Sequence, residues 1–180
     1  MDLESRYAKI IAELDQGHRG LERFTDEEVT ELRRLLQVSL AEKNWSSLEK
    51  SLCLIDHSAS NIPELEEDLI ALLNSDLPTH IKVFTLDASR KHIINSRIQR
   101  GQRLTFEFLE ALKKNLYAKS PEVVEWTLRT IEESGNQGVY FLREFDKIRP
   151  APWKWFNAHQ RAVVELITML ERRWRRFERP

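Results

Sequence analysis

The chain of 180 residues is poor in residues that cross-link or interrupt structure, with one cysteine, five glycines and six prolines. Since Cys53 stands alone, no intramolecular disulfide can form and an oxidising compartment is not implied. So few glycines and prolines favour long helices joined by short loops. No apolar run approaches the roughly 20 residues needed to span a bilayer, and the first residues lack the basic and apolar regions of a signal peptide. We therefore expect a cytoplasmic protein without a transmembrane segment.

Charge is distributed unevenly along the chain. Residues 1–76 contain 17 Asp and Glu against 8 Lys and Arg, a net of −9. Residues 77–180 contain 12 acidic against 20 basic residues, a net of +8, so the two parts sum to the overall −1. Such asymmetry bears on partners and association rather than on fold. It predicts either an anionic partner or a head-to-tail contact between two copies of the chain.

Apolar residues recur with a helical period along almost the whole chain, and no segment shows the alternation of a strand. Thr25 and Glu28 predict a capping box, with a hydroxyl at the helix cap and a carboxylate three residues later. Asn44 predicts another cap, and Pro63 and Pro121 suit the first turns of later helices. The chain is therefore predicted to be all-α. We expect about nine helices, over residues 3–15, 25–42, 44–55, 63–73, 78–98, 104–116, 120–131, 139–148 and 157–178.

Two stretches that lie 76 residues apart, or twice 38, share one spacing of apolar and capping residues. Leu36, Leu40, Asn44, Leu48, Leu52 and Ile55 match Leu112, Leu116, Ser120, Val124, Leu128 and Ile131. A second match, at an offset of 42 residues, relates Phe84-Thr85-Leu86 to Trp126-Thr127-Leu128. Two helices per unit with a period of about 38 to 43 residues is what a stack of helical hairpins requires.

These spacings resemble the helical repeats of the HEAT and armadillo families, over residues 25–148. Ser120-Pro121-Glu122, followed by two valines, is similar to the cap that opens the second element of a HEAT repeat. The resemblance implies a right-handed α-solenoid of HEAT-like hairpins, although the Asp/Arg ladder of such repeats is not evident in the sequence. The alternative is a compact irregular bundle. We expect one domain over residues 1–180, with a Pro/Trp connector at 149–156 and a C-terminal capping helix at 157–178.

No constellation in the sequence points to catalysis or metal binding. The five histidines are scattered and predict no zinc site, and Cys53 has the apolar surroundings of a buried thiol. The acidic clusters at residues 26–28 and 64–68 stand in first helical turns, where they favour the helix dipole. The glycines at 17, 20, 135 and 138 lack the lysine and preceding strand of a phosphate loop. We therefore expect a chain that is not an enzyme and needs no cofactor.

Basic residues form two candidate binding sites for an anion or a partner. One is a ridge over residues 90–119, where cations surround a helix end and a loop. The other follows the C-terminal helix. The candidate residues are Arg97, Arg100, Arg103, Lys113, Lys114, Arg172, Arg175 and Arg176. The alternative is that both clusters are ordinary solvated surface.

The C-terminal helix also carries an apolar seam with 4-3-4-3 steps, the spacing of a helix that docks along a partner. The seam consists of Val163, Ile167, Leu170, Trp174 and Phe177. It is predicted to close the end of the repeat array; pairing with another chain or contact with an anionic membrane are the alternatives. The preceding connector holds a candidate aromatic hot spot, which either covers the core or recognises a partner: Trp153, Trp155 and Phe156.

The sequence therefore predicts a protein–protein interaction module, an adaptor or scaffold that presents a grooved surface. The alternative is a nucleic-acid-binding protein that uses the basic ridge and the Arg-rich C-terminal helix, with an affinity that falls steeply with salt. A further alternative is self-association through the oppositely charged halves.

Overall fold

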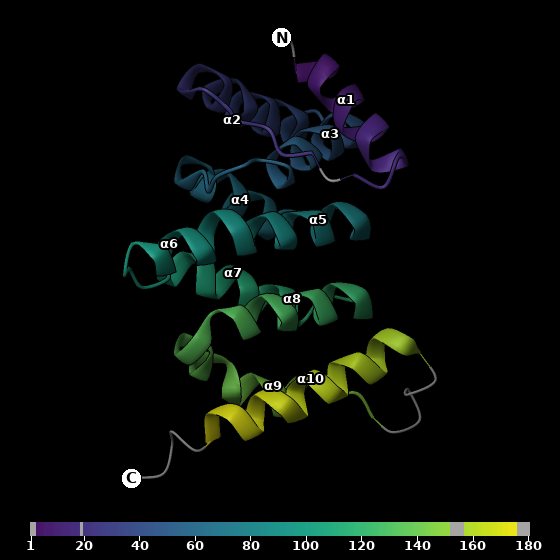
Figure 1. Cartoon of the computed structure of the whole chain (residues 1–180). Coiled ribbons are helices and arrows are strands. Elements are labelled where there is room, and N and C mark those ends of the chain that lie inside the picture. The colour runs from purple at the N-terminus through teal and green to yellow at the C-terminus, as the bar shows by residue number, and fades with distance from the viewer. Residues whose placement is uncertain (1–2, 19, 152–156, 176–180) are drawn as a thin grey trace.

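The computed structural model describes residues 3–18, 20–151 and 157–175 (Figure 1). The regular elements of these residues are helices, and the one β-bridge among them pairs Glu22 with Ser58. The all-α prediction is therefore confirmed. A π-helix at Arg90–Asn95 joins α5 to α6, and 3-10 helices lie at Pro63–Leu65 and Gly135–Phe141. The α-helices are α1 (Leu3–Asp15), α2 (Asp26–Ala41), α3 (Trp45–Asp56), α4 (Glu66–Asn74), α5 (Thr79–Ser89), α6 (Ser96–Gln99), α7 (Phe106–Leu116), α8 (Pro121–Glu133), α9 (Leu142–Ile148) and α10 (Ala158–Trp174).

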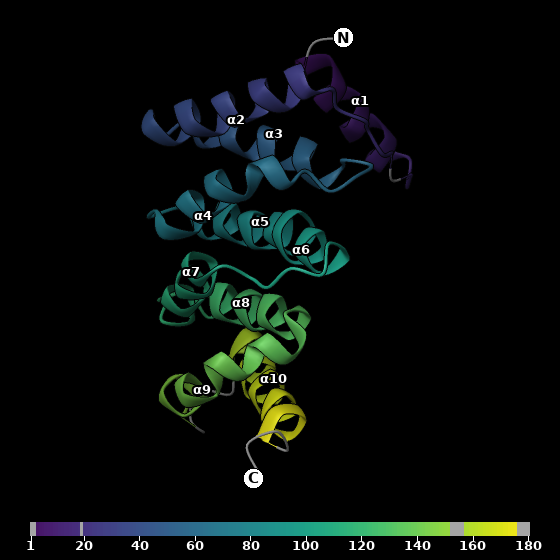
Figure 2. The same ribbon diagram turned by 90° about the vertical axis from the view of Figure 1, so that its left-hand side faces the viewer.

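The helices stack in consecutive pairs. α2 packs against α3, α4 against α5, α7 against α8, and α9 against α10. On one side of the stack α3, α5, α8 and α10 contact one another in that order, and on the other side α2 contacts α4 and α4 contacts α7. Figure 2 shows the two columns, with α4, α7 and α9 on the left and α5, α8 and α10 to their right. The matching residues that lie 76 positions apart thus occupy equivalent places in the α2–α3 pair and in the α7–α8 pair.

Local capping signals place several helix ends as predicted. The Thr25 hydroxyl accepts a hydrogen bond from the Glu28 N–H, and a Glu28 carboxylate oxygen accepts one from the Thr25 N–H at 2.9 Å, which completes the capping box. Asn44 caps α3, and Asn157 caps α10. Ser120 stands at the N-cap of α8, yet its hydroxyl accepts no capping hydrogen bond. Such caps satisfy N–H groups that the helix itself leaves without partners.

One apolar core runs through the stack, and the chain closes it differently at its two ends. At the C-terminal end, Val163, Ile167, Leu170 and Trp174 of the predicted seam are all buried within the molecule, whereas Phe177 lies outside the described residues. At the N-terminal end the apolar stripe of α1 is thinly covered: Ile10 is buried, but Leu14 is 41% exposed. No helix among the residues that the structure describes is long and apolar enough to cross a membrane.

Candidate functional site

The arginines of the predicted ridge are largely engaged with the protein itself. Arg97 Nε donates to both carboxylate oxygens of Glu66, at 2.8 and 3.0 Å, and the Arg97 side chain is only 19% exposed. Another nitrogen of the same guanidinium donates to the carbonyl of Arg103 at 2.9 Å. Arg100 Nε donates to the carbonyl of Ser96. Arg97 is thus an interior ion-pair residue, while Arg103 is exposed and its side chain forms no ion pair with the described residues.

The two lysines of the ridge also have protein partners. Lys113 Nζ lies 3.5 Å from a carboxylate oxygen of Glu110 and 3.9 Å from one of Glu144. Lys114 Nζ donates to the carbonyl of Asn74 at 2.6 Å and so helps to cap the C-terminus of α4. A phosphate at this surface would have to compete with these partners.

The remaining predicted residues divide between α10 and the undescribed parts of the chain. Arg172 is exposed on α10, and Arg175 pairs with Glu171 at 3.0 Å. Arg176 and the predicted aromatic cluster lie outside the described residues; that cluster is Trp153, Trp155 and Phe156.

A buried lysine closes the end of α4. Lys82 Nζ donates to the carbonyls of Leu72, Leu73 and Ser75, at 3.2, 2.9 and 2.5 Å. Burial lowers the pKa of Lys82 to about 8, and the nearby charge of Lys114 acts in the same direction. Lys82 borders a cavity of about 680 Å³, but its three donors already meet three carbonyls. Its position is that of a structural cap.

One pair of potential metal ligands was not predicted. Cys53 and His57 are four residues apart, which places the thiol sulfur 3.8 Å from His57 Nδ1. The same nitrogen lies 2.9 Å from the Cys53 carbonyl, and burial raises the pKa of the thiol, so the reactive thiolate is disfavoured. Among the described residues, no group of three His, Cys, Asp or Glu side chains has the arrangement of a metal site.

Ion pairs join successive helices on one side of the stack. His80 Nε2 on α5 lies 4.0 Å from a carboxylate oxygen of Glu49 on α3. Arg90 Nε, just after α5, donates to Glu133 on α8 at 2.9 Å. We call the surface formed by the outward sides of α3, α5, α8 and α10 the ladder face. The view in Figure 1 looks onto its α5, α8 and α10 part.

The ladder continues between α8 and α10. His159 Nδ1 on α10 lies 2.8 Å from Oε2 of Glu125. The other carboxylate oxygen of Glu125, Oε1, accepts two hydrogen bonds from Arg129, at 3.0 and 2.7 Å. Arg173 lies 4.0 Å from Glu132. The pairs between helices were not predicted, because their partners meet only once the register of the stack is known.

Two aromatic residues stand at matching positions of the ladder face. Phe84 on α5 and Trp126 on α8 are each followed by a buried threonine, Thr85 and Thr127, whose hydroxyl donates to a carbonyl four residues earlier. Phe84 is 44% exposed. Trp126 is half-buried, with the Arg129 guanidinium 6.0 Å from its ring. Phe84 thus exposes apolar surface on α5, and Trp126 with its nearby arginine lies at the matching position of the neighbouring helix α8.

On α3 the matching position is covered by the chain itself. Lys50 corresponds to Trp126 at the 76-residue offset, and α1 packs against α3 there. Lys50 Nζ lies 5.6 Å from the Tyr7 ring and 3.2 Å from the Glu4 carboxylate of α1. The molecule therefore contains an example of a helix that rests on this side of the stack.

No protein-family model, curated protein or solved structure matches the chain. Function is therefore inferred from the geometry of the molecule.

Proposed function

We propose that this chain is a non-catalytic protein–protein interaction module, an adaptor or scaffold, built as a right-handed α-solenoid of HEAT-like hairpins. The stacked helix pairs, the two columns and the repeat spacing support the solenoid arrangement. The ladder face is the proposed binding surface. The observation that carries the proposal is the exposure of Phe84 on α5, at the position that matches Trp126 on the packed helix α8.

The chemistry of these side chains favours a protein partner. Aromatic residues and arginine dominate the binding energy of protein interfaces, and here Trp126 lies near Arg129 on α8 while Phe84 is exposed at the matching position of α5. Polar contacts join α8 to both of its neighbours, since Arg90 donates to Glu133 and His159 Nδ1 lies 2.8 Å from a carboxylate oxygen of Glu125. A surface that is ordered before binding loses less entropy when a partner docks. The example of α1 on α3 supports a helical segment as the partner element.

Nucleic-acid binding is the alternative function, and the experiment has to distinguish it from protein binding. Arg97, Lys113 and Lys114 of the predicted ridge are engaged with carboxylates or carbonyls, which weakens this alternative. A phosphate-dominated interaction loses affinity steeply as salt rises, whereas an interaction anchored by apolar side chains does not.

The test compares variants of the full chain as baits in extract of the native host, with and without nuclease treatment, and retained proteins are quantified by mass spectrometry. The test variant is Phe84→Ser with Trp126→Ala. The matched control is Phe106→Ser, since Phe106 is 64% exposed on α7, in the other column. We expect wild type and control to retain the same proteins at high salt and the test variant to lose them. Retention that the test variant leaves unchanged, or that nuclease abolishes, contradicts the proposal. Circular dichroism checks that each variant is folded.

A further inference from the structure

The N-terminal end of the stack carries an open groove of about 480 Å³ between α1 and α2, with α3 as its floor. Tyr7, Leu35 and Leu54 supply its apolar surface, and the small side chains of Ser47 and Ser51 give it depth. A volume of this size lies within the range of ordinary binding pockets. Both α1 and α2 pack against α3, and the groove is the space that remains between α1 and α2.

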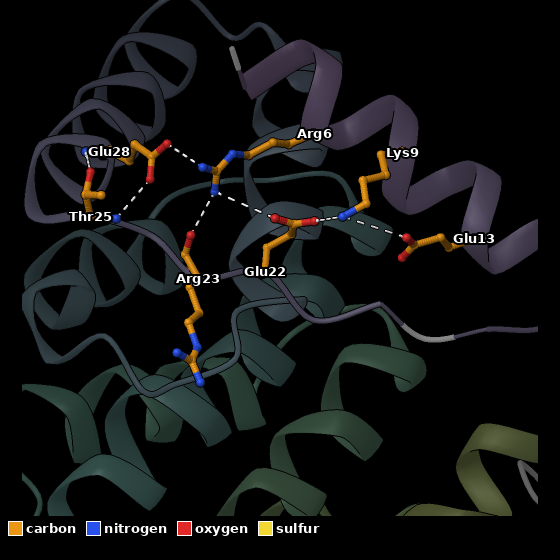
Figure 3. Close-up of polar contacts among 7 residues, drawn as sticks. All are labelled: Arg6, Lys9, Glu13, Glu22, Arg23, Thr25 and Glu28. Atoms are coloured by element: carbon orange, nitrogen blue, oxygen red, sulfur yellow. Dashed lines mark hydrogen bonds and ion pairs between the residues drawn. The ribbon is translucent and has the colours of Figure 1, made fainter. Parts of the chain in front are cut away.

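A polar network fixes one wall of the groove (Figure 3). Arg6 of α1 is only 12% exposed; it donates to Glu28 of α2 at 2.6 Å and to the carbonyl of Arg23 at 2.9 Å. Lys9 of α1 donates to Glu22 at 2.6 Å. Because Glu28 belongs to the capping box of α2, the position of α1 is tied to the start of that helix. The groove is thus formed before anything binds in it.

The rim of the groove is rich in carboxylates. Its lining holds Glu4, Glu27, Glu28 and Glu31. Lys50 pairs with Glu4, Arg6 with Glu28 and Arg34 with Glu31. Glu27 is exposed, and the paired Glu31 stays 44% exposed at its side chain, so both can meet a cation from outside. The groove belongs to residues 1–76, whose net charge of −9 favours a cationic partner.

We infer that this groove binds a basic amphipathic helix from a partner protein. The partner's apolar side chains lie on the floor beside Tyr7 and Leu35, and its lysines or arginines face Glu27 and Glu31. The α2 segment from Glu27 to Leu35 runs about 12 Å, or two helical turns, so the partner's anchors are spaced three or four residues apart. The groove shares α3 with the ladder face but uses none of its aromatic residues on α5 and α8. If the function proposed above holds, a chain with both sites bridges two partners.

The test measures the fluorescence anisotropy of labelled synthetic peptides with the full chain. The probe is an amphipathic peptide of about 14 residues, a length at which a helix is marginally stable alone, with leucines on one face and lysines on the other. Two control peptides are used. One keeps the leucines of the probe and has glutamates in place of the lysines. The other has the composition of the probe in scrambled order. Binding of the probe with no binding of either control is expected. Absence of probe binding, or equal binding of all three, overturns the inference.

Two double variants with the same charge change locate the site. Glu27→Lys with Glu31→Lys is expected to weaken probe binding by about tenfold or more. The control is Glu42→Lys with Glu107→Lys, at two exposed acidic residues away from the groove. It is expected to leave the affinity for the probe unchanged. Equal weakening by both overturns the inference, because it shows a non-specific charge effect. Preference for a peptide of residues 158–180 overturns it in favour of a second copy. None of these results depends on the ladder face.

Discussion

Replacement of His92 tests whether a neutral, buried histidine ties two layers of the stack together. His92 is fully buried in the π-helix between α5 and α6. Its Nδ1 accepts a hydrogen bond from the Ile62 N–H at 2.9 Å, and its Nε2 lies 3.0 Å from the Ile55 carbonyl. The ring therefore carries its proton on Nε2 and links α5 to the loop after α3. A second proton would remove the acceptor that the Ile62 N–H needs.

The expected magnitude follows from the pKa of His92. Burial lowers this pKa to about 4, the charge of Lys91 acts in the same direction, and the Ile55 carbonyl and Asp56 oppose it. A folded-state pKa below the ordinary 6.5 means that the folded protein binds fewer protons than the unfolded chain. Stability is therefore complete above pH 6.5 and is lost as the pH falls towards 4. The full loss is about 3 kcal/mol, of which about 2 kcal/mol falls between pH 7.5 and 5.

The assay is urea unfolding followed by circular dichroism at pH 7.5 and pH 5, for wild type, His92→Gln and His80→Gln. His80 serves as the control because its side chain is 58% exposed on the ladder face. We expect His92→Gln to be less stable at pH 7.5 by about 1–3 kcal/mol, since one buried partner is lost. We also expect the acid-dependent loss to be about 2 kcal/mol smaller in His92→Gln than in wild type and His80→Gln. Equal losses in all three proteins would refute this reasoning.

Three further predictions concern individual contacts. Gly138→Ala should lower stability by about 1–3 kcal/mol, because a methyl group there would overlap the ring of the buried Trp174. An unchanged thermal midpoint would show that α10 does not pack tightly against the 3-10 helix that contains Gly138. Thr25→Ala should cost about 1 kcal/mol in urea unfolding through loss of the capping box with Glu28, and Thr25→Ser should restore most of it. The folded-state pKa of Lys82 is lowered to about 8, so the unfolded chain binds more protons above that pH and stability should rise by about 2 kcal/mol from pH 7.5 to 9.5. Lys82→Met should lack this rise, and a rise in both proteins would contradict the prediction.

The helical elements could be predicted because their signals are local. The capping box at Thr25, the cap at Asn44 and the seam of α10 each depend on residues a few positions apart. The two caps were confirmed, and so was the burial of the seam as far as Trp174. The match at 76 residues also located two equivalent helix pairs, because stacked pairs bury residues at the same spacing.

The binding surfaces could not be predicted in the same way, because they depend on which helices become neighbours. Arg97 contributes to net charge in the sequence, but in the structure it is paired with Glu66, 31 residues away. Likewise, Phe84 follows the apolar pattern of a helix that is surrounded by others, and only the packing of α5 shows that it stays exposed. The one available signal was the 42-residue offset, which aligns Phe84 with Trp126.

The central claim is that the ladder face binds a protein through Phe84 and Trp126. The most direct test is isothermal titration of the captured partner into wild type, the Phe84→Ser/Trp126→Ala variant and the Phe106→Ser control, at low and high salt. We predict an affinity that changes little with salt in wild type and control and is about tenfold or more weaker in the double variant. An affinity that is the same in all three proteins and falls steeply with salt would contradict the account.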